Sequence, residues 1–290
     1  MNFRAVAEGY CFLEAPRAHG DAVWFSDPVI GGLSRLWPDG RIEKFIPDKK
    51  RIGGAAINED DAVVFSGVGG IAWLNSATGK SGMLLDNIDG KPIAAVNDIF
   101  PDAKGGLYFG TSHIAAQEAG APVQTTELYR LDTNGRVTLL WDGLQVANGI
   151  GLSPDGRCLY LNESWLGTFA YAVGADGTLS NRTSLSAQED CDGLAVDCEG
   201  GIWIACFSSG SIIRVLPDGK LDRQEALPVR NVTSLCFGGA DQRDVYVTTG
   251  GDDGLDALMK GLVPPRSASL YRARAEVAGL TVRRTNFRCC

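Results

Sequence analysis

The sequence predicts an all-β protein, a six-bladed β-propeller with four-stranded blades around a central channel, formed as one domain over residues 1–290. Three observations support this prediction. A turn-and-strand motif recurs along the chain, the motifs follow one another at a period of forty-odd residues, and no stretch longer than about ten residues shows helical periodicity.

Each repeat is a polar turn rich in Gly and Asp, followed by an alternating strand of aliphatic and aromatic residues. The central strand residues are 40, 44, 52, 43 and 43 positions apart, and they are Trp24, Val64, Tyr108, Tyr160, Trp203 and Tyr246. A second turn-and-strand pair follows most of them, as in "LWPDGRIEKF" and "RVLPDGKLDRQ". About four strands per unit is the size of a propeller blade. A two-sheet sandwich is the alternative, but it would not explain so regular a period.

The first repeat begins about twenty residues into the chain, which leaves the N-terminal segment without a blade of its own. A blade buries its faces only against its neighbours, so the ring must close. The segment "FRAVAEGYCF", residues 3–12, is therefore expected to add an outer strand to the last blade.

Composition excludes several classes of protein. The chain is 44% hydrophobic and 21% charged, which is ordinary for a globular protein, and its net charge of −8 argues against a nucleic-acid surface. It has no apolar run of 18 residues and no secretory signal in "MNFRAVAEGY". We expect a cytoplasmic monomer or small homo-oligomer that acts on a small molecule, with neither nucleic acid nor membrane as partner.

The eight cysteines are scattered and lack the spacing of a zinc cluster. Four of them fall in or beside expected strands, which suits small buried thiols in a reducing cytosol. These four are Cys158, Cys198, Cys206 and Cys236. Residues 289–290, both cysteines, are expected to form an exposed tail.

Polar residues recur just before the hairpin turns of four repeats. They are Glu14, Asn97 (followed by Asp98), Asn148 and Asp192, whereas the other two repeats have Gly54 and Thr233 or Ser234 at this place. The first strand of each blade lines the channel of a propeller, and one repeat position projects to one depth. These four groups are therefore expected to converge.

The stretch "VANGIGLSPDGRCLYLNES" tests that interpretation. Asn-Gly normally marks a two-residue hairpin turn, but "SPDG" follows within a few residues, and two turns would leave only 150–152 between them. We expect "SPDG" to form the turn and Asn148 to lie on the strand that enters it. The alternative is that these polar pairs are turn residues and that Glu14 is solvated, and their repetition at one position weighs against it.

Two carboxylates and two amides buried together need a partner of opposite charge. A divalent cation would neutralise Glu14 and Asp192 and use the amide oxygens. An all-oxygen set favours Ca²⁺ first and then Mg²⁺ or Mn²⁺, with Zn²⁺ less natural but still open.

These motifs together, in this order, resemble those of one protein family. The segments are "LEAPR", "VNDIFPDAKGGLYFGT", "ELYRLDTNGRV", "VANGIGLSPDGRCLYLNES" and "DCDGLAVDCEGGIWIA". The chain resembles the SMP-30/gluconolactonase/luciferin-regenerating-enzyme (regucalcin-like) family of six-bladed propellers over roughly residues 8–285. The resemblance implies that Glu14, Asn148 and Asp192 bind one metal ion and that Asn97 contacts the substrate or a metal-bound water. It also implies that Asp192 serves as a base and that lactone hydrolysis is the commonest activity.

Some features depart from the family or stay open. Sugar-lactonase members often carry Arg where this chain has Ala95, so a polyhydroxylated sugar lactone is in doubt. His113, in the long segment 112–127, either faces the site or is a surface or packed histidine. Trp165 fits an aromatic wall and a packing role equally well. Segments 112–127 and 250–269 are candidate lids.

The leading hypothesis is a metal-dependent hydrolase of lactones or related carboxylic esters. The sequence has no G-x-S-x-G motif and only two histidines, which leaves little scope for a Ser-His-Asp mechanism. Two alternatives remain. The same metal could act as a Lewis acid in an isomerase, a lyase or an organophosphate hydrolase, or the protein could be a non-catalytic calcium-binding propeller.

Overall fold

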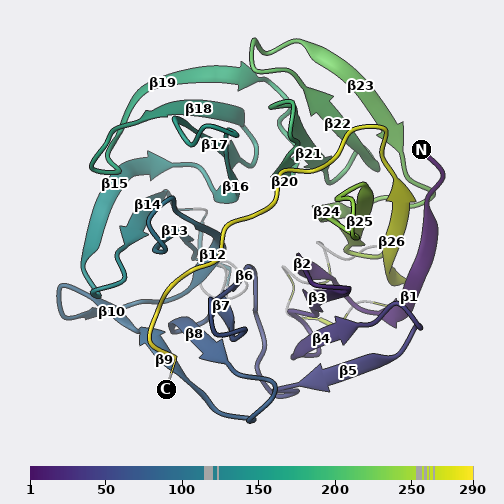
Figure 1. Ribbon diagram of the computed structural model, residues 1–290, viewed down its shortest axis with the longest axis horizontal. Helices are drawn as coiled ribbons and strands as arrows, with labels where there is room; N and C mark the ends of the chain where they lie inside the picture. The colour runs from purple at the N-terminus through teal and green to yellow at the C-terminus, as the bar shows by residue number, and fades with distance from the viewer. Residues whose placement is uncertain are drawn as a thin grey trace.

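The computed structural model describes residues 1–113, 120–122, 124–252, 257, 260, 262–263 and 265–289. Six four-stranded antiparallel sheets form a ring around a channel (Figure 1), which confirms the predicted six-bladed propeller. None of the described residues belongs to a helix that is long and apolar enough to cross a membrane.

Each blade begins at the channel and ends at the rim. Blade one consists of β2 (Glu14–His19), β3 (Ala22–Ser26), β4 (Leu33–Leu36) and β5 (Ile42–Phe45). Blade two consists of β6 (Ala55–Ile57), β7 (Val63–Gly67), β8 (Gly70–Leu74) and β9 (Ser81–Leu85). A short hairpin follows, formed by β10 (Asn87–Ile88) and β11 (Lys91–Pro92). Blade three consists of β12 (Val96–Pro101), β13 (Leu107–Thr111), β14 (Thr126–Leu131) and β15 (Val137–Leu144).

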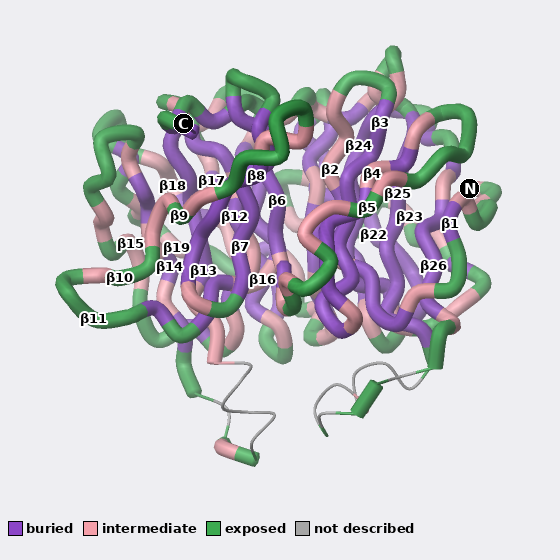
Figure 2. The backbone as a smooth tube through the Cα atoms, turned by 90° about the horizontal axis from the view of Figure 1, so that it is seen from below, coloured by how far each residue is buried: buried purple, intermediate pink, exposed green. Residues whose placement is uncertain are grey.

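The remaining blades repeat this order. Blade four consists of β16 (Ala147–Leu152), β17 (Cys158–Glu163), β18 (Gly167–Val173) and β19 (Leu179–Ser186). Blade five consists of β20 (Cys191–Val196), β21 (Ile202–Cys206), β22 (Ser211–Val215) and β23 (Leu221–Ala226). Blade six consists of β24 (Val232–Gly238), β25 (Asp244–Thr249), β26 (Ala268–Arg274) and β1 (Arg4–Tyr10). Second strands such as β3, β7 and β21 are buried along their whole length, whereas rim strands such as β5 and β23 are partly exposed (Figure 2).

The N-terminal strand closes the ring. β1 pairs antiparallel with β26, so the first strand in the sequence is the outer strand of the last blade. This is the arrangement expected for residues 3–12. Backbone hydrogen bonds thus join the first strand of the chain to the last, and blade six gains the four strands that the other blades have.

The C-terminal residues 275–289, here called the C-terminal strap, cross one face of the ring (Figure 1, yellow). The side-chain amide of Asn58 in blade two holds the strap through two hydrogen bonds. Its Oδ1 accepts from Phe287 N at 2.9 Å, and its Nδ2 donates to Phe287 O at 3.0 Å. Cys289 consequently packs into the core between blades two and three. The expectation of an exposed cysteine tail is wrong for Cys289, and Cys290 lies outside the described residues.

Six of the described cysteines are free thiols: Cys11, Cys158, Cys191, Cys198, Cys206 and Cys236. Cys206 and Cys236 are buried as expected, and burial raises the pKa of each to about 12. Cys158 is half-buried. Cys198 is exposed, contrary to the prediction, because it lies in the turn between β20 and β21.

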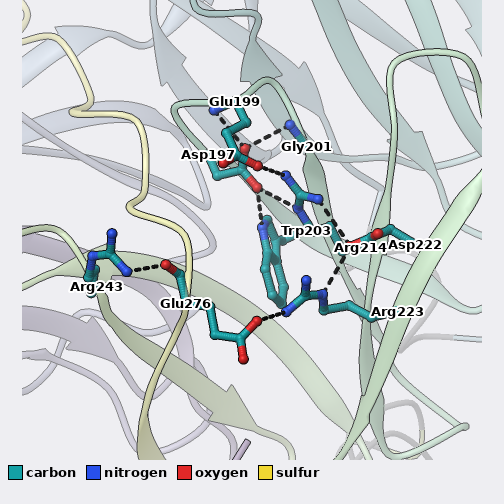
Figure 3. Close-up of polar contacts among 9 residues, drawn as sticks. All are labelled: Asp197, Glu199, Gly201, Trp203, Arg214, Asp222, Arg223, Arg243 and Glu276. Carbon is teal, nitrogen blue, oxygen red and sulfur yellow. Dashed lines mark hydrogen bonds and ion pairs between the residues drawn. The ribbon is translucent and has the colours of Figure 1, made fainter.

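Three buried carboxylates, here called the blade carboxylates, tie strands together within a blade: Asp102, Asp197 and Asp244. Asp197 Oδ1 accepts from Gly201 N at 2.8 Å, while its Oδ2 accepts from Trp203 Nε1 at 2.8 Å and Arg214 Nε at 2.7 Å (Figure 3). The equivalent pairs are Asp102 with Arg130 in blade three and Asp244 with Arg272 in blade six, both at 2.7 Å. In each case the arginine lies on the third strand.

Candidate functional site

The inner strands are irregular where the predicted polar residues lie. The pairing register shifts between Glu14 and Arg17 in β2, and within 96–99, 147–150 and 191–194 in β12, β16 and β20. A β-bulge breaks the alternation of side chains and re-aims those of the bulged residues. These bulges therefore let polar side chains point into the channel from strands that are otherwise apolar.

The Asn-Gly pair of blade four is part of a strand and not a turn. Asn148 and Gly149 lie within β16, and the hairpin turn follows at 153–157. Glycine is required here for close approach, because a Cβ on Gly149 would lie 2.5 Å from the backbone nitrogen of Leu194 in blade five. A Cβ on Gly193 would lie 2.0 Å from a serine Oγ of blade six. Asn148 and Asp192 are thus each followed by a glycine that lets neighbouring blades meet.

All six predicted site residues line one cavity of about 430 Å³: Glu14, Asn97, His113, Asn148, Trp165 and Asp192. Ala95 also lines it. Two smaller cavities are lined by residues of the C-terminal strap, 281–284 in one and 280–283 in the other, so the large cavity and the strap lie toward opposite ends of the channel. Residues 114–116, an expected apolar part of the cavity mouth, lie outside the described residues.

Both amide side chains are held by hydrogen bonds from their nitrogen atoms. Asn97 Nδ2 donates to Ala147 O at 3.1 Å, and Asn148 Nδ2 donates to Ser164 Oγ at 3.1 Å. Ser164 Oγ in turn donates to Cys191 O at 2.8 Å, so Asn148 is linked to the strand that carries Asp192. This pattern makes the amide oxygens the atoms best suited to meet a ligand in the cavity.

Three carboxylates, here called the channel carboxylates, lie close enough to perturb one another: Glu14, Asp98 and Asp192. Burial raises the pKa of Glu14 well above its ordinary value, and repulsion from Asp192 and Asp98 adds to the effect. Burial and repulsion from Asp98 likewise raise the pKa of Asp192. Burial raises the pKa of Asp98 to about 7, opposed by Arg17. The negative charges of these three carboxylates are therefore not fully stabilised by the residues around them.

The donor set fits a hard divalent cation. In the described parts of the chain, no three His, Cys, Asp or Glu side chains are arranged together as metal ligands. A cation in this cavity would therefore need the oxygen of Asn148 in addition to the carboxylates of Glu14 and Asp192. Such a mixed set of carboxylate and amide oxygens is typical of Ca²⁺ sites. Asp98 does not line the cavity.

Two supporting residues were not assigned a role from the sequence. Asp98 follows Asn97 and belongs to the same bulge, but repeat alignment selects only one residue per blade. Asn162, fully buried in β17, donates from Nδ2 to Asp192 O at 2.6 Å and so holds the backbone of the candidate base. The sequence signal for this role is a polar Asn near the end of the otherwise apolar strand segment "CLYLNE".

The rest of the cavity wall is mainly apolar. The rings of Phe12 and Phe207 stack with their centroids 6.2 Å apart, and both line the cavity. Trp165 lies on the wall with 52% of its surface exposed, and its backbone N donates to Glu189 O. This large exposed ring favours the aromatic-wall interpretation of Trp165 over a packing role.

Three residues beside the cavity have left-handed backbone conformations that non-glycine residues seldom adopt. These are Ala15 (φ 55°), Arg51 (φ 61°) and Trp165 (φ 70°). Such conformations cost on the order of 1–3 kcal/mol each and concentrate at functional sites. Ala15 stands in "LEAPR", where the family that the sequence resembles usually has glycine.

Comparison with known proteins defines the family. The family model described as SMP-30/gluconolactonase/LRE-like region matches residues 12–251. Regucalcin from Bos taurus is 33% identical over 219 residues, which are 70% of this chain and 69% of that protein. The chain therefore belongs to the SMP-30/gluconolactonase/LRE-like family.

Two further similarities bear on function and fold. Pentonolactonase XacC from Haloferax volcanii is 29% identical over 270 residues, which are 88% of this chain and 87% of that protein. The matches to regucalcins span about two thirds of their length, 66% of the protein from Danio rerio for example. The crystal structure of a calcium-binding protein, regucalcin, from Agrobacterium tumefaciens superposes with a TM-score of 0.82 at 21% identity, covering 99% of this chain and 97% of that one.

Proposed function

We propose that the protein is a metal-dependent hydrolase of the lactonase type, which opens a lactone or related carboxylic ester at a divalent cation in the channel. The main support is that Glu14, Asn148 and Asp192 line one cavity together with Asn97. The raised pKa values of the two carboxylates indicate a need for positive charge at this place. A pentonolactonase that matches most of this chain supports the same reaction class.

When bound, the cation supplies positive charge that polarises the lactone carbonyl and stabilises the developing oxyanion. Asp192 is the proposed general base, which takes the proton of the attacking water. Asn162 holds its backbone, and the nearby Asn148 side chain opposes the rise in the pKa of its carboxyl group. Asn97 is proposed to orient the substrate through Oδ1, since its Nδ2 is bound to Ala147 O.

The preferred substrate is expected to be less hydroxylated than a sugar-acid lactone. Ala95 provides no donor for a substrate hydroxyl, and the wall of the cavity includes the stacked rings of Phe12 and Phe207. Trp165 and His113 are the proposed substrate contacts in the cavity. A wall without a hydrogen-bonding group at the place of Ala95 has little means to prefer a hydroxylated substrate there over an apolar one of similar shape.

The test is a panel of lactones followed by pH-stat titration. Glucono-δ-lactone and a pentonolactone are compared with simple alkyl and aromatic lactones, with EDTA and after addition of Ca²⁺, Mg²⁺, Mn²⁺ or Zn²⁺. We expect metal-dependent hydrolysis with a higher kcat/KM for the alkyl or aromatic lactones. Faster turnover of the sugar lactones would contradict the substrate prediction but not the reaction class.

The variant Ala95→Arg is a matched probe of specificity, because it places a donor on the cavity wall and leaves Glu14, Asn148 and Asp192 unchanged. We expect it to raise the ratio of kcat/KM for sugar lactones relative to alkyl lactones. A wild-type protein that binds Ca²⁺ but hydrolyses no lactone would instead favour another Lewis-acid reaction or a non-catalytic binding role.

A further inference from the structure

Arg17 extends through the channel behind the candidate metal site. It lies three residues after Glu14 on β2, and its Nε donates to Ala55 O of blade two at 2.9 Å. Its guanidinium carbon lies 5.7 Å from the centre of the Phe100 ring of blade three. Asp98 lies two residues before Phe100 on β12, and Arg17 is close enough to influence the charge of its carboxyl group. The side chain therefore reaches from blade one toward the strand that carries Asp98.

The environment of Arg17 differs from that of the arginines that stabilise the blades. Arg130 and Arg214 each pair with a buried carboxylate at 2.7 Å. Arg17 donates instead to a backbone carbonyl and lines two cavities of about 150 and 190 Å³ beneath the C-terminal strap. Burial lowers the pKa of Arg17, which shows that its charge is costly at this place. Among the described residues, Asp98 is the carboxylate whose charge offsets this cost.

The charges in the channel suggest what that role is. Glu14, Asp98 and Asp192 carry three negative charges when ionised, and Arg17 carries one positive charge. Among these four groups, Arg17 reduces the excess of negative charge from three units to two; Arg51, Glu189 and Asp190 also line the cavity. Without Arg17, one more negative charge would remain uncompensated near the metal ion, and it would weaken the ion's ability to polarise a carbonyl.

We propose that Arg17 is a positioning residue that acts as a fixed counter-charge to Asp98 and so preserves the polarising power of a divalent cation in the channel. The proposal rests on the proposed metal site. Asp98 is the carboxylate through which Arg17 acts, because it lies on the strand that Arg17 reaches and outside the cavity lining, and Arg17 opposes the rise in its pKa. Arg17 thus limits how tightly the metal ion is held.

Arg17→Gln tests the proposal, because glutamine keeps a donor for Ala55 O and removes the charge. Calcium affinity is measured by isothermal titration calorimetry at pH 8, and melting temperature is measured in EDTA. We expect about tenfold tighter Ca²⁺ binding, from one fewer repelling charge near the ion. We also expect a lower Tm without metal and a lower turnover at saturating Ca²⁺. Arg17→Lys keeps the charge and should retain wild-type affinity.

Two further variants separate charge from packing. Asp98→Asn should weaken Ca²⁺ binding, and the double variant Arg17→Gln/Asp98→Asn should return toward wild-type affinity, because the net charge is restored. Arg272→Gln removes an arginine that is paired with Asp244 in blade six, so it should lower Tm without changing calcium affinity. If Arg17→Gln does not fold, Asp98→Asn still measures how calcium affinity responds to the charge that Arg17 offsets, and unchanged affinity in that variant would overturn the proposal.

The failures of the two proposals are distinguishable. A wild-type protein that binds no divalent cation would overturn the proposed metal site itself. Wild-type binding with unchanged or weaker affinity in Arg17→Gln would overturn the role of Arg17 alone. Unchanged turnover in Arg17→Gln at saturating Ca²⁺ would also overturn it, because the polarising power of the ion would not depend on this charge.

Discussion

The channel carboxylates and the blade carboxylates are buried in the same ring but differ in what surrounds them. Asp102 and Asp197 each accept backbone N–H groups and an arginine Nε, at distances of 2.7–3.0 Å. Glu14 and Asp192 instead repel each other and Asp98 across a cavity, and burial raises the pKa of both. The blade carboxylates are paired with arginines of their own blade, whereas the channel carboxylates depend on positive charge from a bound cation.

This difference separates stability from function. A fully hydrogen-bonded buried ion pair holds two strands in one geometry, and breaking it is strongly destabilising. A cluster of buried carboxylates without enough positive charge destabilises the metal-free fold and gains stability only when a cation binds. The positions of the two sets agree with this interpretation. The channel set lies on the bulged first strands, and the blade set lies at the ends of the first hairpins.

The largest expected effect comes from removing one channel carboxylate. Glu14→Gln and Asp192→Asn should each abolish metal-dependent turnover, because loss of one charged ligand weakens metal binding by several kcal/mol. In EDTA each variant should be as stable as wild type or more stable, since one repelling charge is gone. Metal content, turnover and Tm in EDTA are the measurements. Wild-type activity with unchanged metal content in either variant would contradict the site.

The blade carboxylates should respond in the opposite way. Asp197→Ala leaves the Arg214 guanidinium buried without its Nε partner and Trp203 without its acceptor, so we expect a loss of about 3–5 kcal/mol in the free energy of unfolding. Calcium affinity should stay within about twofold of wild type, as this pair does not line the cavity. Urea denaturation and calorimetry check both quantities. The exposed partner Glu199→Gln, a control, should lose less than about 1 kcal/mol.

The channel carboxylates also predict an unusual pH dependence without metal. Asp98 has a folded-state pKa of about 7, above its ordinary value of 3.8, and the pKa values of Glu14 and Asp192 are raised in the same direction. The folded state then binds more protons than the unfolded state between about pH 4 and pH 7, so stability contributed by these groups falls as pH rises through that range. The expected loss is a few kcal/mol.

Denaturation in EDTA at a series of pH values measures this dependence, and the difference between wild type and Asp98→Asn isolates the contribution of one group. The variant should show a shallower decline toward pH 7. Saturating Ca²⁺ should restore stability at the upper end of the range. A wild-type profile parallel to that of Asp98→Asn would show that Asp98 does not titrate in this way.

Much of the fold follows from the sequence because propeller strands are short, local and regularly spaced. The period of the turn motifs gave the number of blades, and the unassigned residues 3–12 gave the closing strand. Asn148 was placed on a strand because a second turn signal left no room for a hairpin at Asn-Gly. These inferences depend on local spacing, which the chain shows directly.

The features that escaped sequence analysis depend on contacts between distant segments or on local irregularity. A bulge turns both Asn97 and Asp98 away from simple alternation, and no residue pattern marks a bulge in advance. Cys289 is buried because Asn58, more than two hundred residues earlier, holds the neighbouring Phe287. Arg17 lies in the family-like segment "LEAPR", but only the structure shows that it extends toward blade three.

The smallest expected effect concerns Asn148, a neutral ligand. Its position in β16 predicts that Asn148→Gly and Asn148→Ala behave alike, because neither Asn148 nor Gly149 has the positive φ that a type I′ turn would require. Both remove the amide oxygen and the hydrogen bond to Ser164, so each should lose about 1 kcal/mol of stability in EDTA. Metal-induced stabilisation should shrink equally in both. The measurement is Tm against calcium concentration, with Ser164→Ala as the control that loses the hydrogen bond but keeps the amide. A wild-type rise of Tm with calcium in Asn148→Gly would exclude Asn148 from the metal ligands. A loss of stability in Asn148→Ala but not in Asn148→Gly would indicate that Asn148 is a turn residue.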